Sequence, residues 1–258
     1  MVRIFQINLG KRSNADEELK LRLNNNESQI ALLQEPKNDR NYKVKASPGW
    51  VNYSTSKTYG KPIRAAVWIK NHLAKDSDSL ILEQFSDRDR STVLLNLRTT
   101  NKQIIKVAIC SAYFPNLDND KANIINPIDN LIEELVTYCK LGKIELILAG
   151  DFNAHNKIWG DAKDDSRGNK IVDFLLGTDL KILNVGNKPT YEVNDKKSII
   201  DLTTATSKVF ECLSNWKVDP GDSFSDHKLI SFDLSLNQKE PQTVSYTHLR
   251  AHETGRNL

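Results

Sequence analysis

Short apolar runs broken by polar residues fill most of the chain, and each run has the length of a β-strand. Runs of four to eight apolar residues that end at turn formers predict strands buried in a core. We therefore expect strands near residues 2–8, 30–34, 65–69, 93–97, 104–112, 144–149, 181–184, 199–204, 213–218 and 229–236.

Three segments have a helical pattern instead. Within residues 124–138, apolar side chains recur at i, i+3, i+4, i+7 and i+8, namely Ile128, Leu131, Ile132, Leu135 and Val136. Residues 14–18 open a helix with acids in its first turn, where the helix dipole favours them, and a third helix is expected over residues 168–176. Many strands with a few helices between them predict one α/β domain built on two packed sheets flanked by helices.

Composition and charge narrow the class of protein only slightly. The net charge of +3 is too small to imply nucleic acid by itself, but it permits a basic face opposite an acidic site. Cys110, Cys139 and Cys212 fit no zinc pattern and indicate reduced thiols. The N-terminus MVRIFQINLG is too polar for a signal peptide, and no run approaches a membrane span. We expect a nuclear or cytoplasmic protein that is not secreted and has no membrane partner.

The C-terminus differs from the rest of the chain. After Pro241 it reads QTVSYTHLRAHETGRNL, with neither periodicity nor helix caps, and VSYTHLRAHET resembles a read-through of foreign adapter sequence. We therefore expect a native domain over residues 1–240 and a non-native, disordered tail over residues 241–258.

Acids and amides stand next to several of the apolar runs: Asn8, Glu35, Asp151 with Asn153, and Asp226 with His227. One acid at a strand end is usually only a turn former or a helix cap. Several together predict convergence on one rim of a sheet sandwich, where loops carry function on a rigid scaffold.

The residue types limit the chemistry of such a rim. Carboxylates and amides without a cysteine cluster make an oxygen-rich site for a hard divalent cation, and Mg²⁺ prefers one or two carboxylates plus water and phosphate. A histidine beside an aspartate supplies an imidazole whose tautomer a carboxylate can fix. Together these groups suit in-line attack of water on a phosphodiester. Serine chemistry is poorly supported, because the chain contains no GxSxG motif.

Six segments carry a family resemblance: QINLG, LLQEP, SAYFPN, LAGDFNAH, SIIDLTTA and FSDHKLISF. Their order resembles the endonuclease/exonuclease/phosphatase superfamily, and AHNKIWG, SRGN and ILNVGNKPTY make the chain most similar to the endonuclease domain of LINE-type (non-LTR) retrotransposons. The resemblance spans roughly residues 3–236. It implies a DNase I-like, four-layer α/β (α+β) fold of two packed mixed sheets flanked by helices, with Mg²⁺ or Mn²⁺ as cofactor.

The resemblance also implies a metal site. Glu35 of QEP would be the main ligand, with Asn8 beside it, while Asp226 would either lie near the metal or only position its loop. Repair-type relatives carry an acid two residues after the first-strand asparagine, whereas this chain has Gly10. Metal binding must then depend more heavily on Glu35, and abasic-site repair becomes a less suitable native role.

Catalytic roles follow in the same way. Asp151 would orient or deprotonate the attacking water, Asn153 would bind that water or a phosphate oxygen, and Tyr113 would contact a phosphate. His227 would stabilise the scissile phosphate, with its imidazole held by Asp201. Four further residues are candidates for substrate binding: Asn116, His155, Lys197 and Ser198.

Several of the candidate residues could have a structural role instead of a functional one. His155 could simply belong to a solvated loop, and Trp159 is more typical of packing than of base stacking. Loop residues able to touch DNA also include Arg167, Lys188, Thr190 and Tyr191.

The resulting hypothesis is a Mg²⁺-dependent endonuclease that nicks double-stranded DNA and leaves a 3′-hydroxyl to prime reverse transcription. A reverse transcriptase domain is then expected in the parent element protein, because none stands in this sequence. Two alternatives stay open. One is a phosphatase or RNA phosphodiesterase of the same superfamily, and the other is a catalytically decayed module that only binds DNA.

Overall fold

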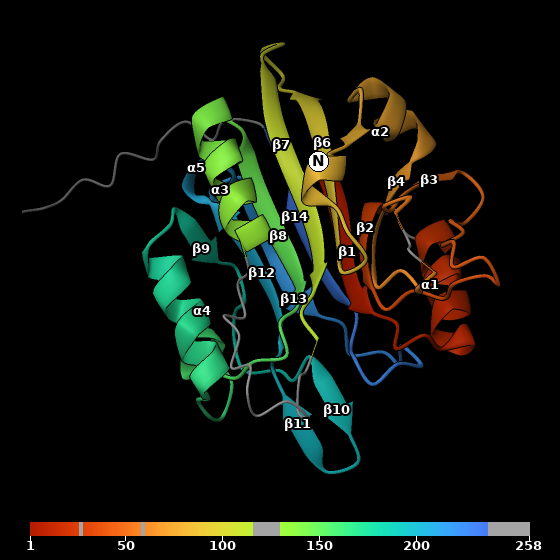
Figure 1. Ribbon diagram of the computed structural model, residues 1–258, viewed down its shortest axis with the longest axis vertical. Coiled ribbons are helices and arrows are strands. Elements are labelled where there is room, and N and C mark those ends of the chain that lie inside the picture. Colours follow the sequence, from red (N-terminus) through yellow and green to blue (C-terminus); the bar gives the residue numbers. More distant parts are fainter. Residues whose placement is uncertain (26–27, 58–59, 116–129, 237–258) are drawn as a thin grey trace, which may run out of the picture.

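A computed structural model describes residues 1–25, 28–57, 60–115 and 130–236 of the protein (Figure 1). The described residues form two six-stranded sheets, a small hairpin and flanking helices. The expected α/β (α+β) fold of two packed mixed sheets is thereby confirmed. The domain boundary at residue 240 and the tail over residues 241–258 lie outside the described residues.

The first sheet has the order β13 (Leu213–Val218), β14 (Ile230–Leu234), β1 (Val2–Asn8), β2 (Ser28–Gln34), β4 (Ala65–Lys70), β3 (Trp50–Tyr53). The second has the order β5 (Leu80–Ile81), β6 (Arg90–Arg98), β7 (Ile104–Tyr113), β8 (Glu145–Asp151), β12 (Asp201–Thr206), β9 (Leu180–Ile182). The hairpin consists of β10 (Tyr191–Val193) and β11 (Lys196–Ser198). The helices are α1 (Ser13–Asn25), α2 (Asn71–Asp76), α3 (Asn130–Gly142), α4 (Ser166–Leu176) and α5 (Ser207–Phe210).

The central strands are buried on both faces and largely apolar, which explains why β2 and β8 form continuous apolar runs rather than alternating ones. Ile30 and Leu32 of β2 belong to the core between the sheets, whereas Ala31 and Leu33 belong to the core beneath α1. Neighbouring side chains of a strand point to opposite faces, so a strand covered on both sides has no polar face. In both sheets the parallel pairs, β1 with β2 and β7 with β8, lie at the centre.

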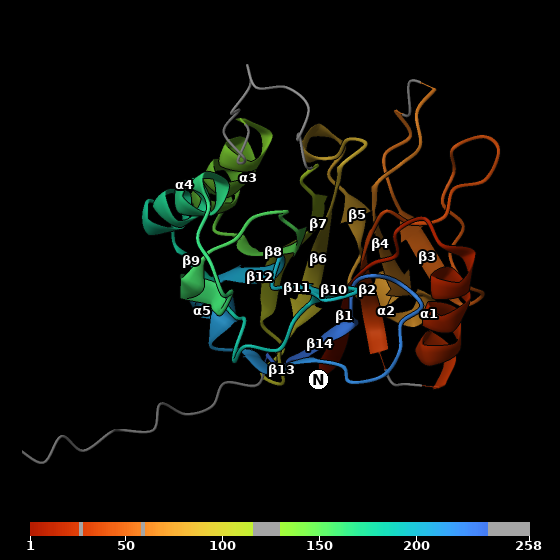
Figure 2. The ribbon, with the colours of Figure 1, turned by 90° about the horizontal axis from the view of Figure 1, so that it is seen from below.

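Helices cover the outer faces and complete four layers. Leu19 and Leu23 of α1 pack on the first sheet, and Ile132 of α3 and Ile171 of α4 pack on the second. Figure 2 shows α1 on one side of the two sheets and α3 with α4 on the other. No helix among the described residues has the length and apolar character needed to cross a membrane.

Polar side chains join the two sheets where their central strands face each other. The Gln6 amide donates to the carbonyl oxygens of Gly150 (3.3 Å) and Leu202 (3.2 Å) and accepts from the Thr203 hydroxyl (2.7 Å). Nearby, the Gln34 amide donates to Ser111 Oγ at 2.9 Å. Because buried hydrogen bonds require defined geometry, these contacts fix how β1 and β2 lie against β7, β8 and β12.

The apolar runs predicted the longer strands and the helices α1 and α4. The shortest elements, β3, β5, α2, α5 and the β10–β11 hairpin, were missed. Such elements are too short for a periodic pattern and depend on neighbours, as β3 does on its pairing with β4. The helix expected over residues 124–138 begins, in the described part, at Asn130.

Gly150 should be irreplaceable for stability. A Cβ atom there would lie 1.8 Å from the carbonyl oxygen of Ala112 on β7, so Gly150→Ala must push β8 and β7 apart. We expect a loss of at least about 2 kcal/mol in the free energy of unfolding, measured by urea denaturation. Gly177→Ala is the control, because the nearest atom to its Cβ would lie 3.5 Å away. Equal stability of both variants would contradict the close packing of β7 on β8.

Candidate active site

Two carboxylates face each other at the ends of neighbouring strands. Asp151 ends β8 and Asp201 begins β12, and the two residues are direct partners in the antiparallel ladder. Both side chains are almost fully buried. Like charges at such positions repel each other strongly away from water, so this arrangement requires a cation or a proton.

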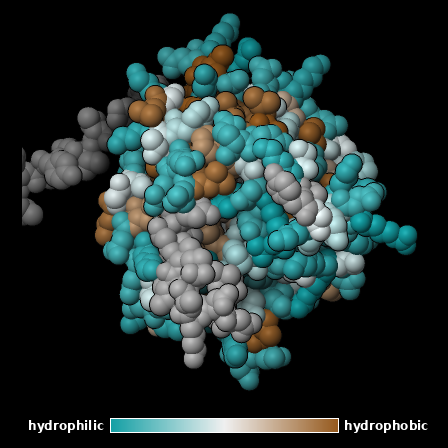
Figure 3. Space-filling model, in the orientation of Figure 1, coloured by the Kyte–Doolittle hydropathy of each residue, from teal (hydrophilic) through white to brown (hydrophobic). Residues whose placement is uncertain are grey.

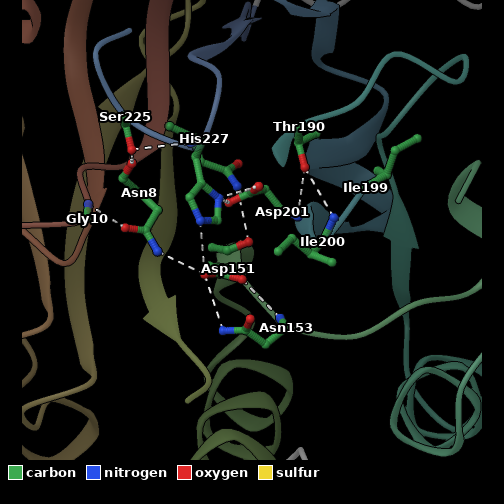
Figure 4. Close-up of polar contacts among 12 residues, drawn as sticks. Asn8, Gly10, Asp151, Asn153, Thr190, Ile199, Ile200, Asp201, Ser225 and His227 are labelled. Atoms are coloured by element: carbon green, nitrogen blue, oxygen red, sulfur yellow. Dashed lines mark hydrogen bonds and ion pairs between the residues drawn. The ribbon is translucent and has the colours of Figure 1, made fainter. Parts of the chain in front are cut away.

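His227 supplies that positive charge from the other sheet. It lies just before β14, and its Nδ1 is 2.9 Å from one Asp201 oxygen and 3.1 Å from the other. Its Nε2 lies 3.7 Å from Asp151 Oδ2. Figure 4 shows the imidazole with Asp201 on one side, Asn8 on the opposite side and Asp151 below it. The predicted pairing of Asp201 with the His227 imidazole therefore agrees with the geometry.

Asp151 accepts hydrogen bonds on both of its oxygens. Asn8 Nδ2 donates to Oδ2 at 2.8 Å, and the Asn153 backbone N–H donates to Oδ1 at 3.0 Å. Burial raises the pKa of Asp151 to about 7, although the positive charge of His227 and these hydrogen bonds act in the opposite direction. The carboxylate can therefore exchange a proton near neutral pH.

The pKa of His227 moves upward. Burial alone would lower it, but the charge and hydrogen bond of Asp201, followed by the charges of Asp151 and Glu35, raise it to about 9. The imidazole is therefore protonated at neutral pH and donates from Nδ1 to Asp201. Its Nε2 carries the second donor into the site.

Three side chains fix this cluster from outside. Thr190 Oγ1 accepts from the backbone N–H groups of Ile200 and Asp201, each at 3.2 Å. Ser225 Oγ donates to the Asn8 carbonyl oxygen at 2.7 Å, which ties the loop before His227 to β1. The Tyr191 ring packs edge-on against the His227 imidazole, with centroids 4.9 Å apart.

Glu35 is held at the same rim in a strained conformation. Its φ is +44°, and Asn153 has a similar φ of +46°, a region that non-glycine residues rarely adopt. The loop after β1 turns back over Glu35, where Lys11 Nζ contacts the carboxylate at 2.9 Å. The Lys11 side chain is 55% exposed, so solvent screens this pair. Asp226 makes a similar pair with Arg12 at 2.7 Å.

The donor atoms at this rim suit a hard divalent cation. Glu35 offers a carboxylate whose partner is exposed and replaceable, and its charge acts on both His227 and Tyr113. The Asn8 amide oxygen accepts from the Gly10 N–H at 2.8 Å and keeps a second lone pair. Asp151, Asp201 and His227 also offer ligand atoms within 4.8 Å of one another, but His227 and Asp201 already bind each other.

Tyr113 lies on β7 beside Asp151, on the side of β8 away from Asp201. The Arg64 guanidinium stacks over its ring, 4.8 Å from the centroid, and Arg64 also pairs with Asp89. Burial, followed by the charges of Glu35 and Asp151, raises the pKa of the Tyr113 hydroxyl to about 12. The hydroxyl therefore stays protonated at neutral pH and can donate a hydrogen bond.

The remaining candidates lie farther out. His155 Nδ1 lies 3.0 Å from Asp161 Oδ2, so this side chain has a structural partner of its own. Lys197 and Ser198 stand on β11, where Lys197 pairs with Glu192 at 2.7 Å. Asn116 lies outside the described residues.

Sequence reasoning missed Arg64 and Ser225, because their partners come from distant segments. Arg64 reaches Tyr113 across 49 positions of sequence, and no local pattern marks such a contact. A weak signal did exist for Gln6. In the strand Val2–Asn8, Gln6 and Asn8 alternate with Ile7, so period two places both polar residues on one face.

Comparison with known proteins gives a family match. Residues 107–231 match the model of the endonuclease-reverse transcriptase family of endonuclease/exonuclease/phosphatase domains. That range includes Tyr113, Asp151, Asn153, Asp201 and His227. No curated protein matches the chain.

Solved structures extend the likeness over nearly the whole chain. The endonuclease domain of TRAS1, a telomere-specific non-LTR retrotransposon, is 26% identical with a TM-score of 0.73, covering 92% of this chain and 100% of that one. The catalytic domain of APE2 from Xenopus laevis is 13% identical (TM-score 0.74, 93% and 94% covered). The AP endonuclease LMAP from Leishmania major is 11% identical (TM-score 0.73, 91% and 87% covered).

These matches confirm the predicted resemblance. The chain is similar to nucleases of the endonuclease/exonuclease/phosphatase superfamily and, among them, to a non-LTR retrotransposon endonuclease. Its fold is that of the DNase I-like AP endonuclease domains.

Replacing Asp201 should release the proton of His227. Because the folded-state pKa is raised above the usual value of about 6.5, protonated His227 stabilises the fold below that pH, and the contribution disappears as pH rises to about 9. In Asp201→Asn the pKa of the imidazole should fall by about one to three pH units. NMR titration of the ring in metal-free protein measures it, with Asp76→Asn on exposed α2 as the control. An unchanged midpoint would contradict the pairing.

Proposed function

We propose that this chain is a divalent-metal-dependent DNA endonuclease that hydrolyses a phosphodiester and leaves a 3′-hydroxyl and a 5′-phosphate. The observation that carries the proposal is the buried Asp151–His227–Asp201 cluster at the rim of two packed sheets. It joins a carboxylate whose pKa burial raises above its usual range to an imidazolium. The similarity to a retrotransposon endonuclease domain supports the choice of DNA.

In the proposed reaction Asp151 accepts the proton of the attacking water. A general base works best when its pKa lies near the operating pH, and burial gives Asp151 such a pKa. Asn8 and Asn153 hold the carboxylate in one orientation through their hydrogen bonds. Asn153 Nδ2 donates to the Phe114 carbonyl oxygen at 3.0 Å and to Asp151 Oδ2 at 3.3 Å, and the longer of these bonds would be exchanged for one to the water or to a phosphate oxygen.

His227 and Tyr113 would face the charge that develops on the phosphate. The imidazolium Nε2–H donates to a non-bridging oxygen while Asp201 fixes the tautomer through Nδ1. Fixed donors of this kind stabilise a transition state without reorganising. The protonated Tyr113 hydroxyl adds a second donor.

Glu35 and Asn8 would hold the divalent cation, for which we propose Mg²⁺, with Mn²⁺ as an active substitute. When bound, the ion supplies neutralisation of phosphate charge. Glu35 must exchange Lys11 for the ion, and the exposure of Lys11 makes that exchange inexpensive in free energy. The Arg12 side chain that pairs with Asp226 is about as exposed as the Lys11 side chain that pairs with Glu35, so Asp226 would either lie near the metal or only position its loop.

The hairpin end of the molecule would receive double-stranded DNA. Figure 2 shows β10 and β11 across the line between the two sheets, and Figure 3 shows hydrophilic residues at the lower tip of the molecule, where Figure 1 places the hairpin. Lys196, Lys197 and Ser198 on β11 could contact the phosphate backbone. The bridge between Tyr191 and His227 connects the hairpin directly to the cluster.

A nick with a 3′-hydroxyl can prime reverse transcription, which is the role we propose for the product. A reverse transcriptase domain would then belong to the parent element protein. The place of action would be the nucleus, where chromosomal DNA lies.

Supercoiled-plasmid nicking in Mg²⁺ tests the proposal. Asp151→Asn should lower the nicking rate by about 10²–10⁴-fold, because a general base is lost, and His227→Gln by about 10²–10³-fold. Asp76→Asn and His72→Gln on exposed α2 are the matched controls and should nick as the wild type does. A polymerase should extend the nicked ends.

Other outcomes would favour the alternatives. Release of inorganic phosphate from small phosphomonoesters without nicking would support a phosphatase, and cleavage of RNA alone would support an RNA phosphodiesterase. Retention of DNA by a folded wild type that cuts nothing in Mg²⁺ or Mn²⁺ would support a decayed binding module.

Metal binding can be measured apart from cleavage. Glu35→Gln removes the proposed main ligand, so the affinity for Mn²⁺, followed by electron paramagnetic resonance, should fall at least about tenfold. Glu192→Gln is the matched control, since Glu192 also pairs with an exposed lysine but lies on the hairpin. Unchanged Mn²⁺ affinity in Glu35→Gln would exclude Glu35 as the main ligand.

A further inference from the structure

Arg167 is a largely buried cation that uses few of its donors. It stands in the first turn of α4, and its Nη1 donates to the Pro115 carbonyl oxygen at 2.9 Å. Its Nε is buried and has no hydrogen-bond partner among the described residues. A guanidinium offers five N–H donors, and most of those of Arg167 have no partner within the part of the chain that the structure describes.

The charge of Arg167 has no direct anionic partner in the described part of the chain. Burial lowers its pKa, while the charges of Asp151, Asp165 and Tyr113 act at longer range in the opposite direction. No ion pair joins Arg167 to a carboxylate within 4.0 Å there. Burying an unpaired charge is costly, so this guanidinium requires an anion that the described residues do not supply.

Arg167 lies next to the segment that holds the catalytic loop. Pro115 follows Phe114, whose carbonyl oxygen accepts from Asn153 Nδ2 at 3.0 Å and whose N–H donates to the Asp151 carbonyl oxygen at 2.9 Å. Asn153, at the lower edge of the cluster in Figure 4, and Arg167 therefore bind successive carbonyl groups of one strand end. Burial lowers the pKa of Arg167, but the charges of Asp151 and Tyr113 act in the opposite direction, so the guanidinium lies within electrostatic reach of the proposed catalytic residues.

The start of α4 is fixed rigidly against the same loop. The Asp165 N–H donates to the His155 carbonyl oxygen at 3.0 Å, and the Asp165 side chain caps the Gly168 N–H at 2.6 Å. A Cβ on Gly168 would lie 2.0 Å from the His155 carbonyl oxygen, so only glycine allows this approach. These contacts explain the glycine of the SRG sequence at residues 166–168, because only glycine lets the start of α4 pack against the loop that contains His155. Arg167 directly precedes this glycine.

We propose that Arg167 is a substrate-binding residue whose guanidinium contacts a non-bridging oxygen of a DNA backbone phosphate beside Asn153. The inference rests on the proposed function, because it requires a phosphodiester substrate. Arginine binds phosphate through several parallel N–H groups, and a partly desolvated guanidinium does so more strongly than an exposed one. The phosphate would accept hydrogen bonds from the guanidinium donors for which the described residues supply no partner.

A purely structural role would need no positive charge. A neutral amide could donate to the Pro115 carbonyl oxygen as Nη1 does, without the free-energy cost of burying a cation. Arg167→Gln therefore separates the two roles, because it keeps a donor and removes the charge.

Fluorescence anisotropy with a short duplex in chelator, where cleavage is suppressed, measures the affinity against salt concentration. Arg167→Gln should weaken binding about tenfold or more and should reduce the magnitude of the slope of log K against log salt by about 0.9, the value for one phosphate contact. Arg167→Lys should restore the slope. The control is Arg98→Gln, an exposed arginine at the far end of β6.

A duplex with one neutral methylphosphonate gives an independent measurement. Replacement of one particular phosphate should weaken binding by the wild type and leave binding by Arg167→Gln unaffected. Should Arg167→Gln fail to fold, Arg167→Met, which keeps an unbranched side chain and removes the charge, takes its place in this comparison. A wild type that nicks DNA beside an Arg167→Gln with an unchanged salt slope would overturn the role of Arg167. A wild type that neither binds nor nicks DNA would overturn the proposed function itself, and the role of Arg167 with it.

Discussion

The His227 imidazolium between Asp151 and Asp201 is the interaction on which the rest of the site depends. The two carboxylates are paired across β8 and β12 of one sheet, and the histidine comes from the loop before β14 of the other. Two buried like charges at such a distance are unstable without a cation. The contact of His227 with the two carboxylates therefore requires that the two sheets pack against each other correctly. The site is assembled by the same packing that completes the fold.

The inward face of β1 shows how a hydrophobic core is converted into a site. Ile4 belongs to the core, Gln6 bonds to the opposite sheet, and Asn8 donates to Asp151. The inward-facing side chains of β1 become more polar toward its C-terminal end. The Gln6 and Asn8 amides both have hydrogen-bond partners, which avoids the free-energy cost of burying an unpaired polar group. Beside the end of this gradient of polarity, Glu35 and Asn153 adopt positive φ.

Much of this could be predicted from the sequence, for physical reasons. Strands covered on both faces must be apolar throughout, so β2 and β8 stand out as runs, and a polar residue directly after such a run marks the rim. The partners of the rim residues could not be predicted in the same way. Lys11 on Glu35, Arg64 on Tyr113 and the unsatisfied donors of Arg167 depend on loop paths and on chain segments distant in sequence, which local periodicity does not encode.

The cationic side chains around the rim differ in burial and in how strongly an anionic side chain holds them. That difference separates side chains that maintain the fold from those that can take part in binding. Arg64 is well buried and paired with Asp89, so it belongs to the scaffold. Lys11 and Arg12 are about half exposed, so water compensates for most of their pairing and a stronger ligand can displace them at little cost. Arg167 is the opposite case, a buried cation whose anion is missing from the described residues. A phosphate at Arg167 would restore charge balance where the described residues leave it incomplete, and a metal ion at Glu35 would displace only the exposed Lys11, so both would be bound with little rearrangement of the scaffold.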